Sequence, residues 1–300
     1  MYGLYKIIYS DKYRVNIGTH VFPTEKYHLL YKRLIEEGVF KKDGFINPSP
    51  ATDEEILLTH TKDYLQKLKR GTLSLDDIFR LELPFSKRLV EASLICAKGT
   101  ILACEYAFKN GICVHIGGGF HHAFSDHGEG FCVFNDIAIG IRSLQKNNKI
   151  KKVAVIDCDL HQGNGTADIF TKDKNVFTFS MHQENNYPGI KPPSDIDIGL
   201  PDGCEDEKYL NYLEKNLFEI IPKFKPELLV YIAGADPYEK DQLGGLAITM
   251  EGLRQRDKIV FSHAKEHNIP VAAVLAGGYA INLSDTVQIH YNMIMEAKNI

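Results

Sequence analysis

The stretch KVAVID at residues 152–157 leads directly into CDLH at residues 158–161. Its run of apolar, largely β-branched residues predicts a strand buried on both faces, as in parallel sheets. Similar runs recur, giving the predicted strands 112–117 (ICVHIG), 152–157, 175–181 (NVFTFSM), 227–233 (ELLVYIA) and 270–276 (PVAAVLA). Amphipathic segments between them give the predicted helices 135–146, 165–171, 206–222, 249–267 and 284–298. This alternation predicts an α/β fold in one domain over residues 1–300, with an open, mainly parallel sheet and helices on both faces.

The first 110 residues are richer in helical patterns. A short strand is expected at 4–8, and helices are expected at 24–38, 52–59, 61–70 and 86–109. The stretch 71–84 lacks a clear period and is expected to be a surface loop. We expect this region to cover one face of the sheet and to build a rim.

The composition excludes several classes of protein. The chain has 300 residues, of which 44% are hydrophobic and 25% charged, as in ordinary globular proteins. A net charge of −4 argues against a broad basic surface for nucleic acid. None of the six cysteines forms a C-x-x-C pair, and no run approaches the roughly 20 apolar residues that span a bilayer. We therefore expect reduced, buried cysteines and a soluble, cytoplasmic protein with no membrane partner; the sequence does not set its oligomeric state.

Polar residues cluster just past the predicted strands. GGGFHH (117–122) follows the first, DCDLH (157–161) ends the second, GAD (234–236) follows the fourth and GGY (277–279) follows the last. In an open α/β sheet, ligands bind beyond the carboxyl ends of the strands. The sequence therefore predicts that these groups meet at one site.

A metal centre is the first expectation for that site. In extended backbone, Asp157, Asp159 and His161 share one face because they are two residues apart. Asp159, His161 and Asp236 together offer one nitrogen and two carboxylates. This set suits a divalent ion such as Zn²⁺ with coordination left open for other ligands.

The adjacent His121 and His122 could both face this site from a glycine-rich turn, and a neutral imidazole is a suitable general base. Asp157 and Asn164 are the candidates to orient them, one for each histidine. Tyr279 could donate a hydrogen bond to a developing oxyanion. Other residues are open to two readings, a narrow apolar channel or plain core packing: Gly130 with Phe131, Tyr187 and Leu243. The remaining histidines are expected to be structural (His115, His127, His182) or exposed or capping on helices (His263, His267, His290).

Longer stretches resemble the histone deacetylase family, which has the arginase–deacetylase fold. They are GGGFHHAFSDHGEGFCVFNDIAIGI (117–141), VIDCDLHQGNGTADIF (155–170), YIAGADPYEKDQLGGL (231–246) and LAGGYA (275–280), with YSDKYRVNIGTHVFP (9–23) and HTKDYLQKL (60–68). The similarity covers most of the chain, and GGGFHH, HQGNG and DQLGGL look most like the class IV branch and its bacterial relatives.

The resemblance implies roles for these residues. Asp159, His161 and Asp236 would hold Zn²⁺, with Fe²⁺ as the alternative ion, and His122 would be the general base and acid. Asp157 would orient His121. Asn164 stands where some relatives carry aspartate, so His122 would have a neutral partner. The remaining assignments are Tyr279 at the transition state, Gly130, Phe131 and Tyr187 along an acyl-lysine channel, and Leu243 near its mouth. In some relatives K⁺ lies beside the zinc; the matching groups are Asp157, the carbonyls of Asp159 and His161, and Ser180.

The expected activity is zinc-dependent hydrolysis of an N-acyl amide on lysine or a related amine. One alternative is an acetylpolyamine amidohydrolase, for which rim carboxylates are needed; the candidates are Glu82, Asp126, Glu129 and Glu184. A binuclear manganese ureohydrolase would bind two metal ions per chain. A non-catalytic binder of acylated amines would bind without turnover.

Overall fold

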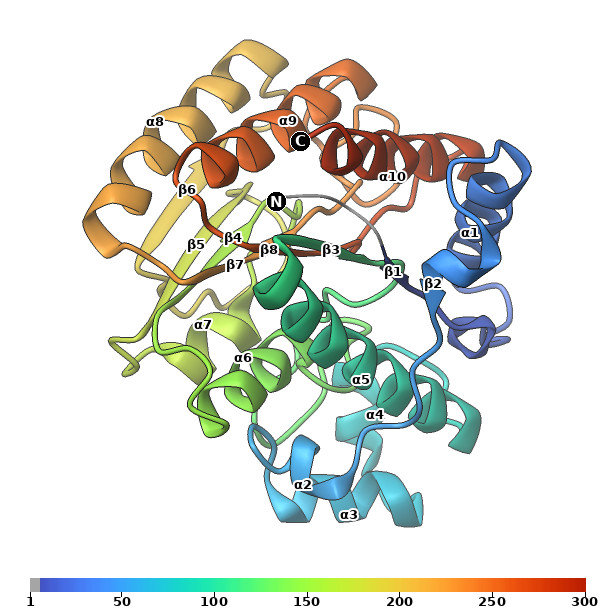
Figure 1. The fold of residues 1–300 in the computed structure, drawn as a ribbon. Helices are drawn as coiled ribbons and strands as arrows, with labels where there is room; N and C mark the ends of the chain where they lie inside the picture. Colours follow the sequence, from blue (N-terminus) through green and yellow to red (C-terminus); the bar gives the residue numbers. More distant parts are fainter. Residues whose placement is uncertain (1–5) are drawn as a thin grey trace.

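The computed structural model describes residues 6–300, and this part of the chain contains one sheet of eight parallel strands in the order β2-β1-β3-β8-β7-β4-β5-β6 (Figure 1). The strands are β1 Ile7–Ile8, β2 Phe45–Ile46, β3 Ile112–His115, β4 Val153–Asp157, β5 Val176–Gln183, β6 Ile196–Leu200, β7 Leu228–Ile232 and β8 Val271–Val274. Every pairing between neighbours is parallel. The predicted α/β sheet is thus confirmed, and the strand expected at 4–8 is seen as β1, with residues 4 and 5 outside the described part.

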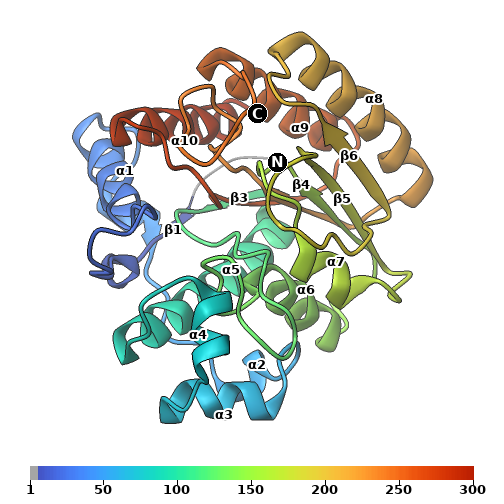
Figure 2. The ribbon, with the colours of Figure 1, turned by 180° about the vertical axis from the view of Figure 1, so that it is seen from behind.

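Helices cover both faces of this sheet (Figures 1 and 2). The helices α8, α9 and α10, with α1 beside α10, lie on one face, and α5, α6 and α7 lie on the other. Their bounds are α1 Glu25–Glu36, α2 Asp53–Ile56, α3 Lys62–Arg70, α4 Leu75–Leu81, α5 Lys87–Asn110, α6 Asp136–Lys146, α7 Asn164–Phe170, α8 Asp206–Phe224, α9 Met250–Glu266 and α10 Leu283–Lys298, with short 3₁₀ turns at Asp11–Tyr13 and Lys42–Gly44. Within residues 6–300, no helix is long and apolar enough to cross a membrane.

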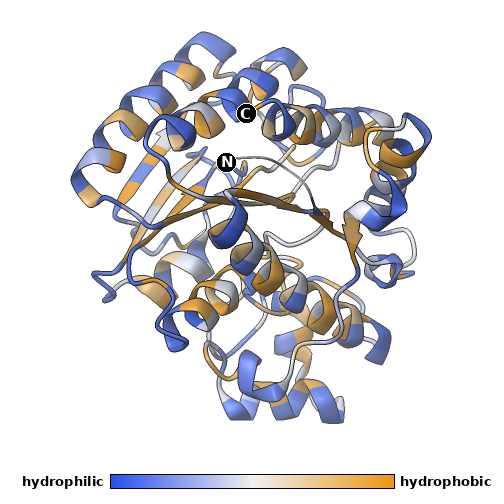
Figure 3. Ribbon diagram, in the orientation of Figure 1, coloured by the Kyte–Doolittle hydropathy of each residue, from blue (hydrophilic) through white to orange (hydrophobic). Residues whose placement is uncertain are grey.

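The sheet is apolar on both faces because alternate residues of each central strand enter different hydrophobic clusters. On β4, Ala154 and Ile156 pack with the α8–α10 side, whereas Val153 and Val155 pack with residues of α5 and α6. Figure 3 shows the hydrophobic sheet between helices whose outer surfaces are hydrophilic. This double burial explains why the central strands read as continuous apolar runs in the sequence.

The expectation of a surface loop over 71–84 is wrong for the middle of this stretch, where α4 forms. Ser74 caps this helix: its side chain accepts a hydrogen bond from Asp77 N, and the Asp77 carboxylate accepts one from Ser74 N. This reciprocal cap compensates for the helix's short length. The pattern S-L-D-D was available in the sequence, but a two-turn helix is too short to show a clear period.

Two strands were missed, and two other expectations need correction. The edge strands β2 and β6 were not predicted, because β2 has two residues and β6 (IDIGL) is half exposed and interrupted by polar residues. The N-terminal region does not cover a single face, since α1 packs on the α10 side and α5 on the opposite side (Figure 1). Between 52 and 59, only Asp53–Ile56 is helical.

Candidate functional site

The two carboxylates and the imidazole of the predicted metal centre lie together at the carboxyl ends of β4 and β7. Their ligand atoms all fall within 4.8 Å of one another, and all three residues are buried. His161 Nδ1 lies 3.3 Å from Asp159 Oδ1 and 3.2 Å from Asp236 Oδ2. A single ion could therefore contact all three side chains.

The charge of this cluster fits a divalent cation. Burial opposes protonation of His161, but the carboxylates of Asp159 and Asp236 outweigh it and raise the pKa of the ring to about 10. Burial, followed by repulsion from Asp159, raises the pKa of Asp236. Asp236 Oδ2 is buried, and among residues 6–300 its polar neighbour is His161 Nδ1, 3.2 Å away, with no other hydrogen-bond donor. Two carboxylates buried this close together are stabilised when a cation binds between them.

Gly277 allows the backbone after β8 to pack directly on these carboxylates. A Cβ atom at this position would lie 2.0 Å from Asp236 Oδ2 and 2.8 Å from Asp159 Oδ2. The Gly277 N–H instead donates to Asp159 Oδ2 at 2.9 Å. Any side chain here would push at least one candidate ligand out of place.

The tandem histidines face each other beside this cluster. His121 Nδ1 contacts Asp157 Oδ2 at 2.7 Å, His122 Nδ1 contacts Asn164 Oδ1 at 2.7 Å, and the two Nε2 atoms are 3.1 Å apart. Each histidine thus contacts a different one of the two candidate partners. Gly119, with φ of 88°, makes the preceding turn, and a Cβ atom there would lie 2.5 Å from Ala276 Cβ.

The two rings differ in charge. Burial lowers the pKa of His121, but the carboxylates of Asp157 and Asp159 outweigh it and raise that pKa to about 9. Burial, then repulsion from His121 and His161, holds the pKa of His122 well below its usual range. His122 is therefore the neutral member of the pair and the one that can accept a proton.

Residues at the start of α6 hold the histidine turn, and sequence reasoning missed them. Asp136 accepts hydrogen bonds from Gly119 N at 3.1 Å and Phe120 N at 2.8 Å, and Asn135 Nδ2 donates to Ala123 O at 3.0 Å. The available signal was an Asn-Asp pair opening an apolar helix. The hydrogen bonds from this pair to the histidine turn, some fifteen residues earlier, depend on the tertiary structure and leave no pattern in the sequence.

A pocket of about 400 Å³ leads from the surface to His122 and His161. It is lined by His20, Glu82, His122, Gly130, Phe131, His161, Asn186, Tyr187, Leu243 and Tyr279. Every residue predicted for a channel lies here, so the channel reading is favoured over plain core packing. His20 and Asn186 were not predicted from the sequence.

The tight turn at Gly130 and Phe131 forms one wall of this pocket. Both residues have positive φ, 51° and 68°, and their N–H groups donate to the carbonyls of Arg80 and Leu81 at the end of α4. Helix α4, which was expected to be loop, therefore supports the channel wall. The mouth next to it carries Glu82, the residue that caps α4.

Tyr279 is buried against Phe131, with ring centroids 6.0 Å apart, and its N–H donates to Asp241 Oδ2 at 2.6 Å. Burial first, then the nearby carboxylates of Asp236 and Asp159, raises the pKa of its phenol well above the usual value. Tyr279 therefore keeps its proton and can act as a hydrogen-bond donor.

Lys26 of α1 is a buried neighbour that sequence reasoning missed. It is only 1% exposed, and its Nζ donates to Ala276 O at 2.7 Å and Gly277 O at 3.1 Å. Burial lowers its pKa to about 8, although nearby carboxylates oppose this shift. These bonds hold the segment that leads to Tyr279. No sequence pattern distinguishes this lysine from a solvated one on an amphipathic helix.

The other histidines are placed as follows. His115 contacts Tyr13 Oη at 2.8 Å and Thr100 Oγ1 at 3.0 Å, and His182 contacts Ser180 Oγ at 3.0 Å, so both have structural partners. The expectation for His290 is wrong, since it is 1% exposed inside α10. The buried face of α10 is wider than its apolar residues indicate, because it also includes the polar residues Thr286 and Glu296.

Asp157 and Ser180, the side chains matched to a K⁺ site, are direct partners on β4 and β5. The K⁺ site itself stays a prediction. A trio at the C-terminal end of α9, with His263 half-buried and Glu266 and His267 exposed, is also close enough to share an ion. The tandem histidines and Tyr279, which lie near the buried trio, are not beside this one.

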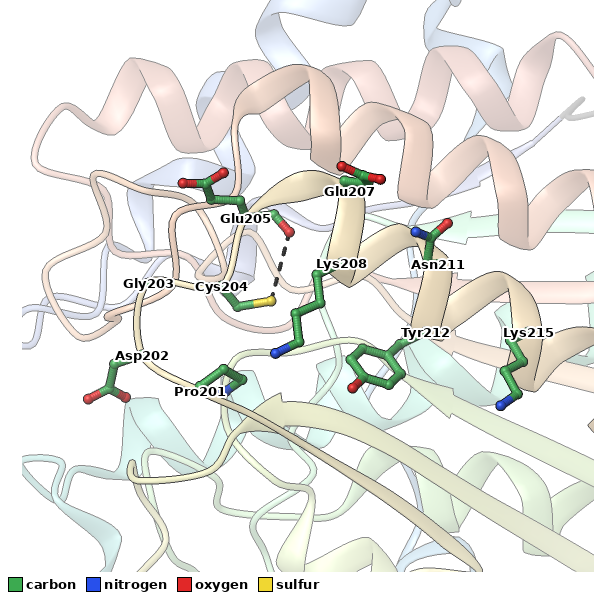
Figure 4. A pocket seen from close by; sticks show the side chains of 10 residues that line it. All are labelled: Pro201, Asp202, Gly203, Cys204, Glu205, Glu207, Lys208, Asn211, Tyr212 and Lys215. Carbon is green, nitrogen blue, oxygen red and sulfur yellow. Dashed lines mark hydrogen bonds between the residues drawn. The ribbon is translucent and has the colours of Figure 1, made fainter.

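A larger surface hollow, of about 570 Å³, lies beside the start of α8 (Figure 4). Its lining is Pro201, Asp202, Gly203, Cys204, Glu205, Glu207, Lys208, Asn211, Tyr212 and Lys215. None of the candidate site residues is among them. The chemistry is therefore placed in the smaller pocket, where titratable groups with shifted pKa values converge.

Known proteins are similar to this chain in sequence and in fold. Residues 20–294 match the family described as histone deacetylase domain. The chain is 38% identical over 297 residues to an uncharacterised protein of Picosynechococcus, with 99% of each chain covered. It is 32% identical over 287 residues to histone deacetylase 2 of Arabidopsis thaliana, covering 91% of this chain and 74% of that protein. A crystal structure of an HDAC homologue from Aquifex aeolicus matches with a TM-score of 0.83 and 26% identity, covering 98% of this chain and 84% of the other.

Proposed function

The chain belongs to the histone deacetylase family of hydrolases, and on that premise we propose that it is a zinc-dependent enzyme that hydrolyses N-acyl amides of lysine. One arrangement carries the proposal: neutral His122 lies next to the buried trio at the base of the pocket, with Tyr279 on the same pocket. We propose further that residues 1–300 act as one catalytic domain. The buried cysteines, none in a disulfide, suit the reducing cytoplasm.

Asp159, His161 and Asp236 would hold Zn²⁺, or Fe²⁺ as the alternative ion. A divalent ion bound there supplies Lewis acidity, which polarises an amide carbonyl and favours deprotonation of water. The nitrogen and carboxylate ligands suit either metal.

His122 is proposed to move the protons. Its Nδ1 faces the Asn164 oxygen, so Nδ1 carries a hydrogen. Its Nε2, 3.1 Å from His121 Nε2, keeps the lone pair that would take a proton from the attacking water. The same Nε2 would then return this proton to the nitrogen of the leaving amine. His121, protonated beside Asp157, would stay in place and strengthen the positive field around the developing oxyanion.

Tyr279→Phe is expected to lower kcat by about 10² to 10³-fold, because the phenol would donate a hydrogen bond only to the developing oxyanion. KM and zinc content are expected to change little. Tyr238→Phe removes the hydroxyl of a buried tyrosine that donates a hydrogen bond to Asp285 outside the pocket, and it serves as the matched control. A kcat within about threefold of wild type in Tyr279→Phe would exclude this role.

The activity itself is tested with an acetyl-lysine peptide, a long-chain acyl-lysine peptide and an acetylated polyamine. We expect release of free lysine amine, loss of turnover after chelation, and recovery when one zinc ion per chain is restored. Two ions per chain at full activity would instead support a binuclear ureohydrolase. Tight binding of the acyl amine by the zinc-loaded protein without turnover would support a non-catalytic binder.

One observation favours a cationic small amine as the second candidate substrate. Glu82 lines the pocket, and burial followed by repulsion from Glu129 raises the pKa of its carboxyl. A polyamine cation at the mouth would relieve this repulsion. Faster turnover of the acetylated polyamine than of both peptides, lost in Glu82→Gln, would establish that alternative.

A further inference from the structure

Glu129 lies one contact beyond the partner of the proposed base. Its Oε1 accepts hydrogen bonds from Asn164 Nδ2 at 2.6 Å and from Tyr187 Oη at 3.1 Å, and its Oε2 lies 3.4 Å from His127 Nε2. The side chain is 21% exposed. The carboxylate is therefore fixed by contacts on both of its oxygens, and one of these contacts leads to His122 through a single amide.

The backbone also holds Glu129 in place. Its N–H donates to Cys132 O at 3.1 Å and its carbonyl accepts from Cys132 N at 2.8 Å, which closes the turn through Gly130 and Phe131. Positive φ at both central residues is typical of a tight hairpin turn. Glu129 thus has little freedom to leave Asn164.

The donors and acceptors along this path fix one arrangement of hydrogens. A carboxylate can only accept, so Asn164 turns its NH₂ group toward Glu129 and its oxygen toward His122 Nδ1, 2.7 Å away. That oxygen also only accepts, so the proton of neutral His122 resides on Nδ1 and Nε2 keeps a lone pair. An asparagine without such a neighbour could present its NH₂ group to the imidazole, and the proton would then reside on Nε2.

The Glu129 carboxylate is charged in this setting. Burial opposes its ionisation, but hydrogen bonds from His127, Asn164 and Tyr187 outweigh burial and hold its pKa below the usual value. The His127 ring has a raised pKa, chiefly because of its hydrogen bond to Glu129, with a further contribution from Asp126. An ionised acceptor therefore faces Asn164 at neutral pH.

We propose that Glu129 is a positioning residue for the reaction: through the Asn164 amide it fixes the His122 tautomer that accepts a proton at Nε2. The inference rests on the proposed role of His122 as general base. In this proposal, the neutral Asn164 transmits the orienting effect of the Glu129 carboxylate to His122.

A reciprocal exchange of side chains tests this relay. In Glu129→Gln the acceptor loses its charge and no longer dictates the amide orientation, so kcat is expected to fall about tenfold or more while KM stays within about threefold. Asn164→Asp alone places two carboxylates in contact and is also expected to lose about tenfold. The double variant Asn164→Asp with Glu129→Gln restores an acceptor facing His122 and a donor between the two positions, so kcat is expected to recover to within about threefold of wild type.

Glu227→Gln is the matched control. Glu227 also accepts two hydrogen bonds, from Lys151 N and Lys152 N at 2.8 Å, but at the opposite end of β4. Its kcat is expected to stay within about threefold of wild type. If the double variant is no more active than the weaker single variant, or if Glu129→Gln keeps wild-type kcat, the relay is excluded.

A second measurement does not depend on turnover. In protein with ¹⁵N-labelled histidine, the imidazole signals missing from His122→Ala identify the His122 ring, and their shifts report which nitrogen carries the hydrogen. We expect hydrogen on Nδ1 in wild type and a mixture in Glu129→Gln. An unchanged tautomer in Glu129→Gln would overturn the inference even if the wild type hydrolyses acyl amides. If the wild type hydrolyses none, the proposed function fails, and this measurement still decides the role of Glu129.

Discussion

Replacing His122 by alanine should lower kcat by about 10³-fold while the protein still binds one zinc ion per chain. The reason is that His122 is the neutral ring of the tandem pair, with its Nδ1 held by Asn164, and so is the group that can move protons. Steady-state kinetics on an acyl-lysine peptide and metal analysis of the same sample check both parts. KM should change far less than kcat, because the proton transfers occur in the transition state.

His263→Ala is the matched control for this variant. His263 is a half-buried imidazole on α9, outside the candidate site, and its buried Nδ1 has no hydrogen-bond partner among residues 6–300. Its loss should leave kcat per folded molecule within about threefold of wild type. If His122→Ala retains more than about a tenth of the wild-type kcat with zinc bound, His122 is not the general base.

Replacing Asp236 by asparagine should abolish activity. It should also change the thermal stability of the metal-free protein and that of the zinc-loaded protein in different ways. Without metal, Asp236 and Asp159 repel each other, and the pKa of Asp236 is raised. A carboxyl with a raised native pKa destabilises the fold as pH rises above its unfolded value, so the neutral amide should raise the metal-free Tm at neutral pH, by about 2 °C. Zinc should then raise Tm much less than in wild type, because binding to the native state is what stabilises it.

Thermal unfolding of chelated and zinc-loaded samples measures both effects. Asp195→Asn is the control. Asp195 lies next to β6 and accepts hydrogen bonds from Thr178, so its replacement should destabilise the protein without changing the zinc-induced rise in Tm. A zinc-induced shift in Asp236→Asn equal to that of wild type would remove Asp236 from the proposed ligand set.

Much of the fold could be predicted from local pattern. The central strands are buried on both faces, so they appear in the sequence as apolar runs, and the expected segments match β3, β4, β5, β7 and β8 to within a few residues. The rule that ligands bind at the carboxyl ends of such strands then brought Asp159, His161 and Asp236 to one place. Edge strand β6 and helix α4 were not predicted, because half-exposed or very short elements leave only a weak hydrophobic pattern in the sequence.

The sequence by itself determined the sheet, its buried strands and the residue types that gather at its edge. Only the tertiary structure decided that Lys26 and His290 are buried and that Glu129 reaches Asn164. The physical reason is range. Strand burial is set by neighbours along the chain, whereas a hydrogen bond such as that from Lys26 to Ala276 joins groups 250 residues apart, and local periodicity carries no information about such a contact.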